Sequence, residues 1–485
     1  MSRVSTGSTS RKLGSTSRNP GSTSRKLVAC VDFGSTFTKA ALVDVADGRL
    51  VATASHRTTI DTDVLDGWDA CLDQLASVEP AARGAEVLAC SSAGGGLRIA
   101  VVGNEQLVTA EAGRRVALSS GGRVVHVSAG GLDAAGVEEL RAAAPDVVLL
   151  VGGTDGGNSE VLLACADALR EARWAGPVVV AGNVDARDEV AARLEEGGTP
   201  YVLADNVVPR IGVLAPGSAR AAIREMFLRH VIGGKHLSAR DGGARFTALV
   251  RGATPDVVLT GVELLARGLD DDRPGVGDVV VVDVGGATTD VHSVVELDPE
   301  DAGLSREVVA TVPVTRTVEG DLGMRWSAVP TVAEGIAAGL LDASLEEAAA
   351  ARQSDPAFVP ADEVARSDDL AIAAAAVTLA LRRHAGRSQV VFGPDPSTGS
   401  GQRGRVLERT GKDLREVALL VGSGGVLRHN PDGASVLTRH LPADGGWQLP
   451  EHARAVVDAD YVLAPAGLLV HDHPAAAYAL VRTLA

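Results

Sequence analysis

The sequence predicts an α/β protein in which one architecture occurs twice, and three observations carry this prediction. Short β-branched runs alternate with Ala-rich helical stretches from Leu27 onward, as in layered α/β folds. LVACVDFGSTFTKAALVDV (27–45) and VVVVDVGGATTDVHSVV (279–295) each combine a strand, a glycine turn and a second strand. The 485 residues are too many for one compact core and suit domains of about 150 to 250 residues.

Three parts are expected along the chain. Residues 1–26 repeat GSTSR units with almost nothing apolar to bury, which predicts a disordered low-complexity tail. Residues 27–250 are expected to form a first lobe with an inserted α/β segment, and residues 251–485 a second lobe.

The apolar runs predict the elements in order. After the two strands of 27–45, we expect six strands in the first half, at 86–90, 99–102, 123–127, 146–151, 177–181 and 200–204. Helices are expected at 64–77, 104–116, 133–143, 158–172, 185–196 and 217–231. In the second half, after 279–295, we expect helices within 331–384, a Gly/Ser/Pro loop at 394–405, a strand running into a glycine turn and a helix at 417–429, and a last helix at 473–484.

Composition and charge exclude several classes of protein. The net charge is -16, and the basic tail leaves an acidic body, which argues against a nucleic-acid groove. The cysteines, Cys30, Cys71, Cys90 and Cys165, form no CxxC pair, which disfavours a zinc site, an iron-sulfur cluster within one chain or a disulfide framework. No apolar run is long enough to span a membrane, and the amino terminus lacks a secretory signal. We therefore expect a cytoplasmic protein.

Three glycine turns follow buried strands in a pattern that suits phosphate binding, because backbone N–H groups then face outward. In the first, Asp32 precedes a turn where Gly34 allows close approach, Ser35 and Thr36 can donate hydrogen bonds, and Lys39 supplies a positive charge. The other two turns hold the remaining candidate residues, Asp283, Gly285, Gly286 and Thr288 in one and Gly422, Ser423, Gly424 and Gly425 in the other. Taken alone, a glycine turn of this kind more often serves only to reverse the chain than to bind phosphate.

The order and spacing of the three turns resemble the actin-like, ribonuclease H-like ATPase superfamily, which includes sugar kinases and heat-shock ATPases. The resemblance implies two lobes around a nucleotide cleft, with ATP and Mg²⁺ as cofactors. It also implies that the two hairpins hold the β- and γ-phosphates, while the GSGG turn passes under the adenosine. A side chain at Gly424 is therefore expected to block nucleotide and to leave the secondary structure intact.

The two aspartates are the predicted catalytic and metal-binding residues. Mg²⁺ prefers carboxylates and retained water, and Asp32 and Asp283 would face each other between the lobes. By resemblance, Asp32 positions the metal through its waters and Lys39 meets a phosphate oxygen. Asp283 holds metal or orients the attacking water. The alternative for either aspartate is a purely structural role, as a capping or turn residue.

A wider set of segments resembles a narrower family. These include DFGSTFTKAALVDV, CSSAGGGLRIAVVG, DVVLLVGGTDGGN, VVVVDVGGATTDVHSV and RTVEGDLGMRWSA. Together they are similar to the accessory protein of adenosylcobalamin-dependent glutamate mutase, a family called GlmL or MutL that is unrelated to the mismatch-repair protein MutL. The resemblance implies an ATP-driven reactivating chaperone whose partners are mutase subunits. No Asp-x-His-x-x-Gly cobalamin motif is present, so His292 and His429 are expected to be supporting or surface residues.

Some alternatives stay open at this point. The glycine-rich stretch 147–158 is either turn geometry or a surface for a ligand or partner of the subclass. A small-molecule kinase of the same superfamily would need a substrate pocket and a base that the sequence does not reveal. An activator of acyl-CoA dehydratases would need cluster cysteines, and a nucleotide-gated assembly protein would polymerise with ATP.

Overall fold

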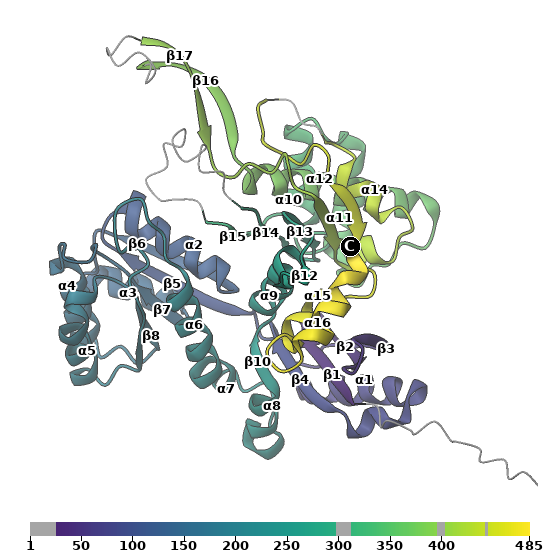
Figure 1. The fold of residues 1–485 in the computed structure, drawn as a ribbon, viewed down its shortest axis with the longest axis horizontal. Helices are drawn as coiled ribbons and strands as arrows, with labels where there is room; N and C mark the ends of the chain where they lie inside the picture. The colour runs from purple at the N-terminus through teal and green to yellow at the C-terminus, as the bar shows by residue number, and fades with distance from the viewer. Residues whose placement is uncertain (1–25, 297–311, 395–402, 442–444) are drawn as a thin grey trace, which may run out of the picture.

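A computed structural model describes residues 26–296, 312–394, 403–441 and 445–485 of the chain. The expected tail, residues 1–26, lies outside this range apart from Lys26. Within the described residues the chain forms three five-stranded sheets and two smaller two-stranded ones, with helices covering the larger sheets (Figure 1). The predicted α/β class is therefore confirmed.

The first sheet has the spatial order β10-β4-β1-β2-β3. Its strands are β1 Leu27–Phe33, β2 Phe37–Asp44, β3 Arg49–Arg57, β4 Glu86–Ser91 and β10 Val250–Ala253. The first three strands form an antiparallel meander, and β4 and β10 continue in parallel on the other side of β1. α1, Val64–Val78, packs on this sheet through a buried face that includes Trp68.

The second sheet repeats this design, with the order β15-β14-β13-β18-β19. Its strands are β13 Val279–Val284, β14 Thr289–Val294, β15 Val314–Glu319, β18 Leu419–Ser423 and β19 Arg454–Val457. Again three antiparallel strands are followed by two parallel ones beside the first. The same order and directions in both sheets define the duplicated actin-like, ribonuclease H-like fold that the sequence motifs predicted.

A third sheet is inserted between β4 and β10. It is entirely parallel, with the order β6-β5-β7-β8-β9, and comprises β5 Leu97–Gly103, β6 Gly122–Ala129, β7 Val147–Leu150, β8 Val178–Val180 and β9 Tyr201–Leu203. The neighbouring helices are α2 Glu111–Ser119, α3 Ala134–Ala143, α4 Glu160–Glu171, α5 Arg187–Glu196 and α6 Gly217–Met226. This unit lies to one side of the first sheet (Figure 1). The boundary expected between residues 250 and 251 falls inside β10, and the division into lobes stays a prediction.

Three helices lie between the two repeated sheets: α9 Thr254–Arg267, α15 Leu463–Leu469 and α16 Pro474–Val481 (Figure 1). α9 and α15 cross with almost no space between them. A Cβ at Gly261 would lie 2.2 Å from the Leu463 carbonyl oxygen, and one at Gly467 would lie 2.0 Å from the Val257 carbonyl oxygen. These glycines let the helices pack backbone to backbone, and residues of both sheets share one buried core with them.

Helices α10 Ala328–Ala337, α11 Glu346–Ser354 and α12 Glu363–His384 cover the second sheet, as the Ala-rich sequence predicted. They are followed by β16 Arg387–Pro394 and β17 Arg403–Thr410, which pair as a projecting hairpin (Figure 1). The sequence predicted only a loop, at 394–405, between the two strands. Most of that expected loop, 395–402, lies outside the described residues. In the described part of the chain no helix is long and apolar enough to cross a membrane.

Candidate functional site between the repeated hairpins

The two hairpins carry the predicted phosphate loops in equivalent positions. In the first, Asp32 pairs across the strands with Lys39, and in the second, Asp283 pairs with Asp290. Both turns close with the same backbone bond, from the Gly34 amide to the Phe37 carbonyl at 3.1 Å and from the Gly285 amide to the Thr288 carbonyl at 2.9 Å.

The two turn-closing glycines have no room for a side chain. A Cβ would lie 2.6 Å from the accepting carbonyl oxygen at Gly34 and 2.8 Å from it at Gly285. The neighbouring turn residues Ser35 and Thr36 are exposed, while Gly286 and Thr288 are half-buried. The turns therefore keep polar groups at the surface next to the two aspartates.

The third turn follows β18, whose parallel register places Ser423 beside Asp283. Gly424 has φ +100, and a Cβ there would lie 2.1 Å from the Val284 carbonyl oxygen. Gly422 is enclosed by leucine side chains, whereas Gly425 is exposed and has open space around its Cβ position. A side chain at Gly424 would therefore clash with the backbone of Val284, which counts against the expectation that it would leave the secondary structure intact. Gly425 is the residue of this turn that has room beside it.

Asp32 is buried and already holds three donors. The Thr254 hydroxyl donates to its Oδ1 at 2.5 Å, the Tyr461 hydroxyl donates to its Oδ2 at 2.8 Å, and the Cys90 thiol lies 3.7 Å from Oδ1. Thr254 begins α9, and Tyr461 lies between β19 and α15. The carboxylate is thus held by elements from both halves of the chain.

Asp283 has a different environment. It is half-buried, and no hydrogen bond to its carboxylate occurs among the described residues. Burial raises its pKa to about 6, with Asp290, Asp32 and Asp458 adding to the rise and Lys39 opposing it. The structure thus brings Asp32, Asp283 and Lys39 within electrostatic reach of one another, and at neutral pH it leaves the Asp283 carboxylate charged without a donor.

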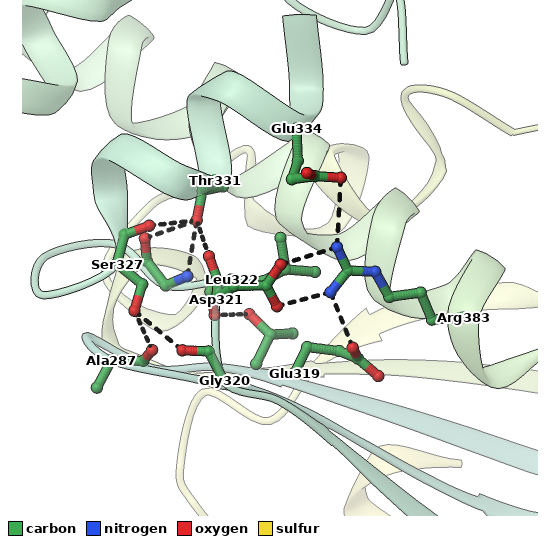
Figure 2. A network of polar contacts seen from close by, with 11 residues as sticks. Ala287, Glu319, Gly320, Asp321, Leu322, Ser327, Thr331, Glu334 and Arg383 are labelled. Atoms are coloured by element: carbon green, nitrogen blue, oxygen red, sulfur yellow. Dashed lines mark hydrogen bonds and ion pairs between the residues drawn. The ribbon is translucent and has the colours of Figure 1, made fainter. Parts of the chain in front are cut away.

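The segment after β15 supports the turn of the second hairpin, the second predicted phosphate loop. The Ser327 hydroxyl donates to the Ala287 carbonyl at 2.7 Å and to the Gly320 carbonyl at 3.1 Å (Figure 2). The amides of Met324 and Arg325 donate to the carbonyls of the two loop glycines, Gly285 and Gly286, at 3.0 and 2.7 Å. The loop conformation therefore depends on a segment some 40 residues further along the chain.

Polar contacts, exposed at Arg383 and buried at Thr331, fix this supporting segment in turn. Arg383, near the end of α12, pairs with Glu319, Asp321 and Glu334, as Figure 2 shows. The Thr331 hydroxyl accepts from the Gly323 amide at 2.8 Å. These contacts tie the supporting segment to α10 and α12.

Arg316 links the second hairpin to the inserted unit. It is 6% exposed and pairs through its Nε and Nη2 with Asp290, whose other oxygen accepts from the Thr288 hydroxyl at 3.2 Å. Its Nη1 donates to the carbonyls of Leu118 and Gly122 at 3.2 and 3.1 Å, at the end of α2 and the start of β6. One guanidinium therefore connects the candidate phosphate loop with the inserted sheet.

Sequence comparison places the chain among known proteins. A family model described as MutL protein matches residues 28–484. Protein MutL of Clostridium tetanomorphum is 35% identical over 465 residues, which cover 93% of this chain and 97% of that protein. The chain belongs to the MutL protein family. The resemblance that the sequence motifs indicated is thereby confirmed.

Solved structures similar to this MutL-family protein are more distant. A glycerol dehydratase reactivase is 14% identical with a TM-score of 0.33, and the match covers 92% of this chain and 99% of that one. The ethanolamine utilization protein EutJ of Carboxydothermus hydrogenoformans is 10% identical with a TM-score of 0.26, covering 95% and 92% of the two chains. The family assignment rests on the sequence matches.

The glycine-rich stretch 147–158 of this MutL-family protein is held by its own hydrogen bonds. Asp155 accepts from the Asn206 side chain at 2.8 Å and from the Val184 amide at 3.3 Å, and the Gly156 amide donates to Asp185 at 2.6 Å. These contacts agree with the turn interpretation. Of the two histidines singled out from the sequence, His292 is buried in the second sheet and His429 is exposed.

The residues around the aspartates suit a magnesium ion held through phosphate and water. In the described ranges no group of three or more His, Cys, Asp or Glu could enclose a metal directly. Two carboxylates, Asp32 and Asp283, lie beside the hairpin turns of this MutL-family protein, and burial, together with its negative neighbours, raises the pKa of Asp283. Such a site favours an added cation, and Mg²⁺ commonly binds with few carboxylates and several waters.

The sequence did not indicate Tyr461 or Thr254, because each contacts a residue more than two hundred positions away. Arg316 and Ser327 belong to the family motif RTVEGDLGMRWSA, but the sequence gave neither of them a role. The sequence did contain a signal for these residues, the motif RTVEGDLGMRWSA. A motif that is shared with the family and overlaps β15 indicates a contact with the turn of the neighbouring second hairpin.

Proposed function

We propose that this MutL-family protein binds Mg-ATP and Mg-ADP between its two hairpins and hydrolyses ATP. One observation carries the proposal: two copies of the same hairpin bring Asp32, Lys39 and Asp283 into one electrostatically coupled group. Gly425 leaves open space in the adjoining third turn. Backbone amides at glycine turns, one lysine and two carboxylates are the groups that bind a metal-bound triphosphate.

The roles of the residues follow from their surroundings. When bound, Mg²⁺ would neutralise charge on the phosphates and so ease attack by water. Asp32, oriented by Thr254 and Tyr461, would accept hydrogen bonds from metal-bound water. Lys39 would pair with a phosphate oxygen. Asp283, whose pKa of about 6 leaves it ionised at neutral pH, would accept a hydrogen bond from the attacking water and orient it.

We further propose that the protein uses this cycle to reactivate an adenosylcobalamin-dependent mutase. The support is membership of the MutL family and its resemblance to glutamate mutase accessory proteins. Radical enzymes of this type can lose the adenosyl group and retain a damaged cobalamin, so a nucleotide-driven movement that opens the partner would allow cofactor exchange. For ATP to drive the exchange, the ATP and ADP forms must bind the mutase with different affinities.

A binding measurement tests the first step. Mg-ATP or Mg-ADP at one hundred times its dissociation constant should stabilise the folded protein by about 2.7 kcal/mol. A thermal-shift titration with both nucleotides, with and without Mg²⁺, measures this. A flat titration with both nucleotides would exclude the nucleotide site.

A reactivation assay tests the second step. A cognate mutase inactivated with hydroxocobalamin is mixed with this protein, Mg-ATP and fresh adenosylcobalamin. We expect recovery of mutase activity with ATP, and little recovery with a non-hydrolysable analogue or with Asp283→Asn. Equal recovery in all three mixtures would contradict an ATP-driven reactivase, as would no recovery despite a demonstrated complex.

Arg316 offers a way to separate nucleotide binding from its effect on the partner. Arg316→Lys keeps a positive charge beside Asp290 but cannot bond both Asp290 and the two carbonyls of the inserted unit. We expect it to retain Mg-ATP binding within about threefold and to lose most ATP-dependent reactivation. Arg193→Lys, on α5, is the control, because its ion pairs with Asp167 and Glu189 lie within the inserted unit and away from this contact. Full reactivation by Arg316→Lys would show that the contact does not couple the two units.

A further inference from the structure

We propose that Tyr461 is a positioning residue that couples the second half of the chain to Asp32 and Lys39 of the candidate site. Its hydroxyl orients Asp32, and its ring holds Lys39. The inference rests on the proposed nucleotide site and adds a residue to it. Tyr461 lies after β19, while Asp32 and Lys39 lie on β1 and β2, so both contacts cross between the repeated units.

The backbone presents Tyr461 in an unusual conformation. Its φ is +57, in the left-handed region that bulky residues rarely adopt. Asp458, which is buried, accepts hydrogen bonds from the amides of Val462 and Leu463 at 2.8 and 3.3 Å, and so fixes the turn that holds the tyrosine. A strained residue that its surroundings hold in place, next to two candidate catalytic side chains, indicates a functional constraint.

The hydroxyl leaves Asp32 with one free acceptor position. A carboxylate offers about four lone-pair sites. Thr254 and Cys90 approach Oδ1, and Tyr461 takes one site on Oδ2. The remaining site on Oδ2 is where a metal-bound water can be accepted.

The ring acts on a different residue. The Lys39 ammonium lies 3.9 Å from the ring centroid. The Arg428 guanidinium, at the end of the short helix α13, Gly425–Arg428, lies 5.1 Å from it. Cation–π attraction at these distances holds a cation over the ring face. The ring therefore keeps the ammonium of Lys39 near Asp283. It also connects the first hairpin, which carries Lys39, to α13, which follows the third glycine turn.

Two variants separate the two roles. Tyr461→Phe removes the hydroxyl and keeps the ring, whereas Tyr461→Leu removes both. Tyr478→Phe is the matched control, because it deletes a tyrosine hydroxyl that donates to the Pro274 carbonyl at 2.9 Å, away from the hairpins. The readouts are the Mg²⁺ concentration for half-maximal ATP hydrolysis and the ratio of ATP to ADP affinity.

We expect Tyr461→Phe to raise the half-maximal Mg²⁺ concentration by at least threefold and to leave the ATP-to-ADP affinity ratio unchanged. Tyr461→Leu should raise the Mg²⁺ requirement similarly and also lower the affinity ratio by at least threefold, since Lys39 loses its support. Tyr478→Phe should match the unsubstituted protein in both readouts. If both Tyr461 variants match it too, the inference is wrong.

A nucleotide-free measurement keeps this test independent of the proposed function. A double-mutant cycle compares the unfolding equilibrium constants of Tyr461→Phe, Asp32→Asn and the double variant. We expect the effects of the two changes to deviate from independence by at least threefold. Independent effects would overturn the inference. Coupling in a protein that fails to bind nucleotide would instead support the contact and reject the nucleotide site.

Discussion

Asp283→Asn is expected to reduce ATP turnover more than tenfold while making the nucleotide-free protein more stable at neutral pH. Turnover should fall because the amide cannot orient the attacking water as the carboxylate does, and positioning dominates phosphoryl transfer. Stability should rise because the substitution removes a half-buried charge whose carboxylate has no hydrogen-bond donor in the part of the chain that is described. Nucleotide binding should remain measurable.

The pH dependence of this stability change follows from the pKa of Asp283, which rises from 3.8 to about 6 on folding. Between these values the folded state binds more protons than the unfolded state, so the carboxyl's contribution to stability falls as pH rises through this range. Above pH 6 the ionised Asp283 carboxylate lowers the free energy of unfolding by a constant amount, about 3 kcal/mol at most.

Melting temperatures of both proteins at pH 4 and pH 7.5 measure this effect. The gain from Asp283→Asn should be present at pH 7.5 and nearly absent at pH 4, where the carboxyl is mostly protonated in the folded state. Asp290→Asn is the contrasting variant, because that carboxylate is paired with Arg316 and its loss should destabilise the protein. Unchanged turnover in Asp283→Asn, or equal melting temperatures at pH 7.5, would contradict the assignment.

The two adjacent glycines of the third turn should respond to substitution in opposite ways. Gly425→Val is expected to keep the melting temperature within a few degrees and to weaken nucleotide binding at least about tenfold, because its side chain enters open space beside the turn. Gly424→Val is expected to destabilise the fold by about 2 to 6 kcal/mol, since it combines a positive φ with a Cβ 2.1 Å from the Val284 carbonyl oxygen.

Circular dichroism melting and nucleotide titration of both variants separate these outcomes. Gly286→Ala and Gly285→Ala form a second pair of the same kind. Gly286→Ala should leave the fold stable, because its Cβ meets only ordinary contacts, whereas Gly285→Ala should destabilise it, because its Cβ lies 2.8 Å from the Thr288 carbonyl oxygen. Normal nucleotide binding by Gly425→Val would show that the nucleotide does not bind beside the third turn.

The sequence by itself was sufficient to predict the duplicated fold, the strands of the inserted sheet and the residues of the three turns. Asp32, Gly34 and Lys39 belong to one hairpin, so a run of eight residues determines both their identity and their register. Alternating and β-branched patterns are local, and they indicate a buried strand wherever it packs. The β16–β17 hairpin was missed because a Gly/Ser/Pro run dominates the pattern between its strands.

Only the tertiary structure decided which residues from distant segments complete the site. Tyr461 reaches Asp32 across 429 positions, Thr254 across 222, and Arg316 reaches Leu118 across 198. Such contacts depend on how the two repeated sheets pack around α9 and α15, and that packing depends on close backbone approach at Gly261 and Gly467. Local periodicity carries no information on that geometry, because a tyrosine in a turn has the same sequence pattern whether it faces solvent or a carboxylate from the other half of the chain.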